Sequence, residues 1–322
     1  MSRSRKNTKN KSSARGPIAR KVIKASNYHF KNKIINLSDW RESKIIAEEY
    51  QKSVISENNL EQYDPLHAVY MYAQNQLSLL IEQITVLPML KKLSEAYEKA
   101  EEDYLPSYPP MSPLTKSYFF CWGAFDLSTG GAKKEAIASV VIDFCKSQNT
   151  DEGLLSLFET MLESRMGVYK HEGSDGKYVF LKELVTNKEI KVISTSGYSG
   201  LVGEIWFVRV LPPPFGDINI DYSVVFTTPY ILGEIAHGGS FNPSVEKNWL
   251  SFFERNIFKM KVRDRKEAYE NLMKYGLSKN YWNEYIFLAY RNHTDNMILL
   301  EGFPDVNSSL PHAKLSVSNK PL

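Results

Sequence analysis

Six acidic and imidazole side chains in the C-terminal part of the sequence could do chemistry together. They are Glu284, His293, Asp295, Glu301, Asp305 and His312. Carboxylates and imidazoles bind divalent metals, and a bound metal can activate water for hydrolysis. Asp295 and Glu301 bracket a short apolar run, roughly as acids do in some metal-dependent nucleases. However, no Lys follows at the Glu-x-Lys spacing usual in such nucleases, and Asp305 also suits an ordinary turn.

A second group is purely basic. Eleven of the 40 Lys and Arg residues lie in residues 1–33, which hold no Asp or Glu, so the remaining chain carries 29 bases and 37 acids, a formal charge of −8. Such a segment can bind nucleic acid by releasing counterions from phosphates. The candidate contacts are Arg3, Arg5, Lys6, Lys9, Lys11, Arg15, Arg20, Lys21 and Lys24. The alternatives are a solubilising tail, a tail that folds back on the acidic body, or an organelle transit peptide.

Other chemistry finds little support in the sequence. There is no P-loop, GxSxG, HExxH or dinucleotide-binding glycine pattern, and we predict no cofactor and no metal ligand set. Cys121 and Cys145 stand apart from each other and from any histidine cluster, which indicates buried thiols. Aromatic and basic residues of the central stretch could stack nucleic-acid bases, although the pattern favours a core role for the aromatic ones. They are Tyr178, Lys182, Tyr198, Trp206 and Arg209.

The element that would position these groups is a β-rich stretch at residues 166–232. Apolar and β-branched runs alternate there with turn residues, which predicts five short strands. They are expected at residues 166–171, 177–184, 189–194, 204–211 and 222–227. This spacing is typical of a small antiparallel β-barrel or roll. We therefore predict an α+β fold with an N-terminal helical region, this central β module and a helical C-terminal region.

Helical patterns lie on both sides of the β stretch. Asp64 and Pro65 begin a long apolar stripe at residues 64–97, which would face the core or a protein partner, and Pro88 should interrupt it. The aromatic run at residues 118–127 favours a buried strand over a short apolar helix. The predicted organisation follows the chain: a disordered basic tail at 1–33, a helical region at 34–105, an α+β module at 113–232, a helical region with a terminal strand at 240–315, and a disordered tail at 316–322.

Several motifs resemble those of a family. They are SPLTKSYFFCWGAFDL, VFLKELVTNKEI, GEIWFVRVLPP, KYGLSKNYWNEYIFLAY and LLEGFPDVNSSLPHA. Together they resemble a group of uncharacterised bacterial proteins, some of whose relatives carry a zinc motif of the SEC-C type. This chain has no such motif, so no zinc role follows. The resemblance implies a bacterial, cytoplasmic setting and brings no activity.

These observations lead to three hypotheses of function. The first is a non-catalytic protein that engages a macromolecule, most plausibly nucleic acid through the basic N-terminal tail. The alternative is a metal-dependent hydrolase or nuclease that uses the C-terminal cluster. The second alternative is a protein-binding component of a larger complex that uses the 64–97 helix. No apolar run approaches the ~20 residues that span a bilayer, and no secretory signal begins the chain, so we expect no membrane partner.

Overall fold

The five predicted strands form in the computed structural model, which describes residues 16–32, 62–105, 112–128, 134–214, 220–236, 239–278 and 280–302. The strands are β1 (Met166–Asp175), β2 (Tyr178–Glu183), β3 (Glu189–Ser194), β4 (Ile205–Leu211) and β5 (Ser223–Val225). Gly176 lies between β1 and β2 with a φ of 58°, and Asn187 precedes β3 with a φ of 55°. Both are residue types that tolerate the left-handed conformation, so the turns form where the sequence indicates.

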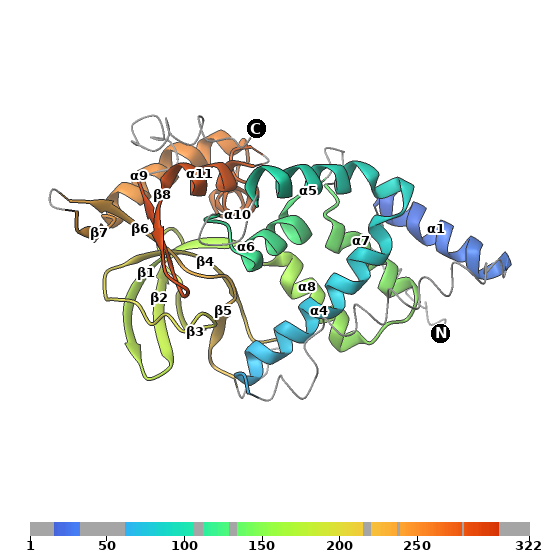
Figure 1. Ribbon diagram of the computed structural model, residues 1–322, viewed down its shortest axis with the longest axis horizontal. Helices are drawn as coiled ribbons and strands as arrows, with labels where there is room; N and C mark the ends of the chain where they lie inside the picture. Colours follow the sequence, from blue (N-terminus) through green and yellow to red (C-terminus); the bar gives the residue numbers. More distant parts are fainter. Residues whose placement is uncertain are drawn as a thin grey trace, which may run out of the picture.

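The five strands close into a barrel (Figure 1). β1, β2 and β3 pair antiparallel in order, and β4 pairs antiparallel with both β1 and β5. β5 runs parallel to β3, with Val192 opposite Ser223. The sheet is therefore mixed, whereas we predicted an antiparallel one. Five strands that alternate in direction around a closed barrel must include one parallel pair, and β3–β5 is that pair.

Alternate residues of the barrel strands fill its interior, as the pleat of a β-strand requires. Trp206 is completely buried at the centre. The surrounding buried side chains are Tyr169, Val179, Leu181, Val192, Val208, Val225 and Ile231. This small core explains why so short a stretch folds as one module.

Further strands extend the sheet beyond the barrel. β6 (Tyr230–Ile235) pairs with β4, and β9 (Ile298–Glu301) runs parallel to β6. β8 (Tyr290–His293) and β7 (Phe241–Pro243) pair with β9 and β6 respectively. The predicted C-terminal strand is confirmed as β9, and the described structure adds β8 as its hairpin partner.

The N-terminal helical region runs from the barrel to the opposite end of the molecule (Figure 1). It contains α4 (Pro65–Thr85), a short 3-10 turn (Pro88–Leu90) and α5 (Lys91–Tyr104). The Asp64 side chain accepts a hydrogen bond from the Leu66 amide at 3.0 Å, and Pro88 separates the two helices as predicted. The apolar stripe of α4 is buried in the protein's own core, at Leu66, Tyr70, Ala73, Leu77 and Ile84.

The aromatic run before the barrel is helical, so our prediction of a strand there was wrong. α6 (Lys116–Cys121) continues directly into a π-helix (Trp122–Asp126). All five side chains of the π-helix are buried. A segment buried on every side shows no polar face, so its pattern cannot distinguish helix from strand. α7 (Ile137–Ser147) and α8 (Glu152–Glu163) then lead into β1.

Three C-terminal helices pack together beside the barrel (Figure 1). They are α9 (Glu246–Ile257), α10 (Arg265–Tyr275) and α11 (Tyr281–Ala289). Aromatic side chains dominate their buried faces, including Trp249, Tyr269 and Trp282. No helix in the described part of the chain is both long and apolar enough to cross a membrane.

An ordered helix, α1 (Pro17–Asn32), lies within the segment that we predicted to be a disordered tail, so that prediction needs correction. Ala19, Val22 and Ile23 are buried, and α1 packs on α7. The Glu135 carboxylate accepts hydrogen bonds from the amides of Ile18 at 3.2 Å and Ala19 at 3.1 Å. These tertiary contacts order a helix that its own composition does not stabilise. Residues 1–15, 33–61, 106–111 and 303–322 lie outside the described residues, and they include the first part of the predicted helical region at 34–105 and the predicted tail at 316–322.

Candidate functional site

The predicted C-terminal cluster is only partly assembled. His293 and Asp295 line one pocket of about 350 Å³ together with Thr115 and Thr228. Glu284 lies on α11, where one carboxylate oxygen is 3.4 Å from the Tyr104 hydroxyl. His293 contacts the Tyr290 hydroxyl through Nδ1.

Glu301 has a structural role at the end of β9. Its carboxylate accepts a hydrogen bond from the Ile235 amide at 3.1 Å and pairs with Arg291 Nε at 3.2 Å. Asp305 and His312 lie outside the described residues. Across the described ranges, no group of three or more His, Cys, Asp or Glu side chains could hold a metal ion. The described members therefore do not form a metal centre by themselves.

The predicted base-stacking residues divide between the inside and the outside of the barrel. Trp206 is completely buried and its Nε1 donates to Glu204 at 2.9 Å, while Tyr198 donates to the same carboxylate at 2.8 Å. Arg209 is also buried. Tyr178 and Lys182 are half-buried on the opposite face of β2. Trp206 and Arg209 are therefore inaccessible to a large ligand, whereas Tyr178, Lys182 and Tyr198 are partly exposed.

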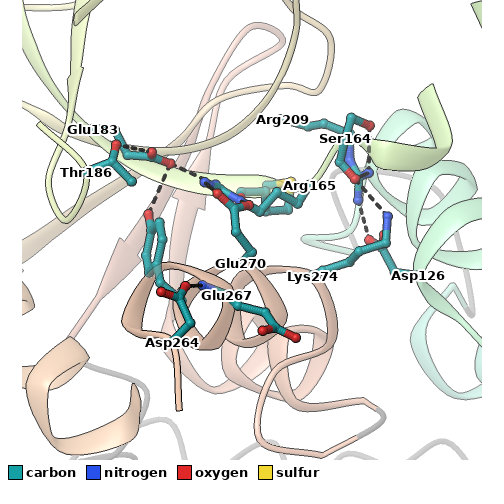
Figure 2. Close-up of polar contacts among 12 residues, drawn as sticks. Asp126, Ser164, Arg165, Glu183, Thr186, Arg209, Asp264, Glu267, Glu270 and Lys274 are labelled. Atoms are coloured by element: carbon teal, nitrogen blue, oxygen red, sulfur yellow. Dashed lines mark hydrogen bonds and ion pairs between the residues drawn. The ribbon is translucent and has the colours of Figure 1, made fainter. Parts of the chain in front are cut away.

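A larger pocket, of about 750 Å³, opens between the barrel and α10. Arg165 precedes β1 and lines this pocket; its Nη1 donates to Glu183 at 2.7 Å and its Nη2 donates to Glu270 of α10 at 3.0 Å (Figure 2). The hydroxyls of Thr186 and Tyr269 also donate to Glu183. Burial is the largest single influence and opposes ionisation of Glu183, but the hydrogen bond and charge of Arg165 and the hydrogen bonds from Thr186 and Tyr269 together outweigh it and lower the pKa of that carboxyl. Arg165 is thus fully occupied by two carboxylates, and any free positive charge must come from elsewhere.

A second buried network lies beside the Arg165 network (Figure 2). Arg209 of β4 donates to Asp126 at the end of the π-helix and to the Ser164 carbonyl at 2.9 Å. Lys274 of α10 lies 3.4 Å from the second Asp126 oxygen. Burial lowers the pKa of Lys274, against the opposing effect of Asp126. This network joins the helical region, the barrel and α10, which gives it a structural role.

The rim of the large pocket continues into a strongly basic turn, residues 258–266, which follows α9 and includes the first two residues of α10. Its bases are Lys259, Lys261, Arg263, Arg265 and Lys266, and all five are exposed. None forms an ion pair with another residue in the described part of the chain. Phe258, which begins the turn, is 84% exposed.

The sequence analysis missed this basic turn, although a signal was present. Bases occur at every second position from Lys259 to Arg265. They alternate with Phe258, Met260 and Val262, which indicates an extended segment with one basic, solvent-facing side and one apolar side. Phe258 looks like a continuation of the apolar face of α9, and only the structure places it in solvent.

The described part of the predicted nucleic-acid contacts lies on α1. Arg20, Lys21 and Lys24 are exposed there, and they form no ion pair with any residue that the structure describes. Arg3, Arg5, Lys6, Lys9, Lys11 and Arg15 lie outside the described residues. α1 and the basic turn lie in different regions of the molecule (Figure 1).

Comparison with models of known protein families, with curated proteins and with solved structures finds no match to this chain. The resemblance to uncharacterised bacterial proteins therefore stays a prediction, and the function has to be inferred from these surfaces.

Proposed function

We propose that this protein is a non-catalytic nucleic-acid-binding protein whose basic N-terminal segment, ending in α1, contacts the phosphate backbone. The observation that carries the proposal is the division of α1 into two faces. Ala19 and Val22 are buried against the protein, whereas Arg20, Lys21 and Lys24 are exposed and unpaired within the described structure. A helix anchored in this way presents its bases at fixed positions.

The charge distribution supports a localised contact. Residues 1–33 carry eleven bases and no acid, while the rest of the chain has a formal charge of −8. An acidic body repels nucleic acid, so binding should depend on the basic segment rather than on the overall charge. Each phosphate that a base neutralises releases counterions and makes affinity depend steeply on salt.

The test is a salt series of binding to labelled DNA and RNA, measured by fluorescence anisotropy. We compare the full chain with a variant in which Arg20, Lys21 and Lys24 are replaced by glutamine. Deleting residues 1–33 is less informative because it would expose the face of α7 that α1 covers. The matched control replaces Lys92, Lys99 and Lys247, three exposed lysines on other helices, by glutamine.

For duplex DNA, the slope of log affinity against log salt should become shallower by about 0.9 for each phosphate contact removed. The control should keep the slope of the parent protein. An unchanged slope in the α1 variant would refute the proposal. Degradation of the probe in the presence of Mg²⁺ would instead favour the hydrolase alternative and direct attention to His293 and Asp295. The absence of binding at low salt would leave a protein-binding component as the better hypothesis.

A further inference from the structure

We infer that the basic turn, residues 258–266, and the adjoining pocket form a second contact that selects single-stranded nucleic acid. This assignment rests on the nucleic-acid binding proposed above and names the kind of strand that is bound. It involves a different part of the chain from α1, so the two contacts can be tested separately.

The charges of the turn are available to a ligand. Its five bases are exposed and unpaired within the described structure. Two of the nearby acids have partners: Asp264 accepts a hydrogen bond from the Glu267 amide at 2.7 Å, and Glu270 accepts one from Arg165. Within residues 258–266, Asp264 is the one acid against five bases, so the turn keeps a formal charge of +4. Phosphates are the complementary groups.

Phe258 provides a stacking surface beside these charges. It is 84% exposed, whereas the next two apolar residues of the turn, Met260 and Val262, pack partly against the core. The chain reverses at Lys261, which has a left-handed φ of 57°. A single exposed aromatic ring flanked by bases is the combination that binds unpaired bases in proteins that recognise single strands.

The pocket adds space for an unstacked base. Its volume of about 750 Å³ lies within the range of small-molecule pockets. Val185, Ile190 and Val210 contribute apolar lining, while Arg265 and Lys266 belong both to the lining and to the basic turn. Single strands can splay a base away from the backbone, which a stacked duplex does only at an energetic cost. Phosphates bound on the turn would thus bring a base to the opening of the pocket.

The balance of charge and apolar surface favours a nucleic acid over an anionic membrane. Amphipathic membrane-binding segments bury a broad apolar face in the lipid boundary. The turn exposes five bases, but Phe258 is its only fully exposed large apolar side chain. The turn therefore exposes too little apolar surface to anchor it in a lipid bilayer.

The experiment uses the full chain and fluorescein-labelled oligo(dT), oligo(U) and a mixed-sequence duplex. Phe258→Ala should weaken single-strand binding roughly 5- to 150-fold, the range for one stacked base, and leave both the salt slope and duplex binding unchanged. Lys261→Gln combined with Arg263→Gln should make the single-strand salt slope shallower by about 1.4, since two phosphate contacts are lost. The control, Lys92→Gln with Lys99→Gln, should match the parent protein. All of these residues are exposed, so the variants should fold.

The outcomes separate this inference from the proposed function. If both turn variants bind single strands like the parent while the α1 variant loses binding, the turn is not a site and the proposed function stands. If the parent binds none of the probes, both are refuted. If the parent binds phosphatidylserine vesicles but no oligonucleotide, and Phe258→Ala abolishes vesicle binding, the turn is a lipid contact and the inference is overturned.

Discussion

Replacing Asp126 with asparagine removes a carboxylate that faces two buried cations. Asp126 accepts a hydrogen bond from Arg209, which is 1% exposed, and one of its oxygens lies 3.4 Å from Lys274 Nζ, whose side chain is 14% exposed. Asparagine keeps the shape of the side chain but not its charge. Both cations would then stay buried without a countercharge.

The expected loss of unfolding free energy is about 3–5 kcal/mol, the usual cost of removing one partner from a buried ion pair. The pH dependence provides a second measurement. Burial already lowers the pKa of Lys274, and losing Asp126 should lower it further. The unfolded lysine then binds more protons than the folded one between the lowered pKa and about 10.4, so the variant should regain stability as pH rises through that window.

Urea unfolding monitored by tryptophan fluorescence measures both effects. The matched control is Glu95→Gln, which breaks an exposed pair with Lys91 at 3.7 Å and should change stability far less. A third variant, with Asp126→Leu, Arg209→Met and Lys274→Met, should recover much of the loss because no buried charge remains. If Asp126→Asn is no more destabilising than Glu95→Gln, the charge network does not hold these three regions together as we describe.

Three further predictions concern the ends and the interior of the fold. Gly16→Ala would place a Cβ atom 1.9 Å from a Glu135 carboxylate oxygen, so it should displace the carboxylate that accepts hydrogen bonds from the first amides of α1 and speed hydrogen exchange in that helix. Unchanged exchange would contradict this contact. Burial raises the pKa of the Cys121 thiol to about 12 and also raises that of the Cys145 thiol. Neither thiol should therefore react with Ellman's reagent before the protein unfolds. A fast reaction of the native protein would show that the thiols are accessible. Burial also raises the pKa of many tyrosines, for example that of Tyr97 to about 12, above the unfolded value of about 10. Stability should therefore be fully present below pH ~10 and fall above it, and a urea midpoint that stays constant through that range would argue against the tyrosine burial.

Local signals in the sequence were enough to predict the framework of the fold. The five strands of the barrel were predicted because short β-branched runs alternate with residues that suit turns. Asp64 and Pro65 correctly marked the start of α4, and Pro88 marked its interruption. In each case a few neighbouring residues fix the backbone through sterics or a capping hydrogen bond, so no distant contact is needed.

Other features depended on contacts between distant residues. The pattern of residues 118–127 could not decide between helix and strand because the segment is buried all round. α1 is ordered by α7 and by Glu135, which lies more than one hundred residues away. The parallel pairing of β3 and β5 follows from the closure of five alternating strands into a barrel, and hydrophobic alternation carries no information about strand direction.

The candidate site likewise combines features set by the sequence with features set by contacts between distant residues. The sequence by itself determined the basic character of residues 1–33 and the alternating bases of the turn, because charge is a property of composition. Closeness in sequence was a poor guide to the C-terminal cluster, since Glu284 contacts Tyr104 and Glu301 contacts Ile235, both from other parts of the chain. Only the tertiary structure brought Arg165, Glu183 and Glu270 together around one pocket and left Phe258 in solvent. Burial and proximity are set by how the helices pack on the barrel, and a linear pattern does not contain that packing.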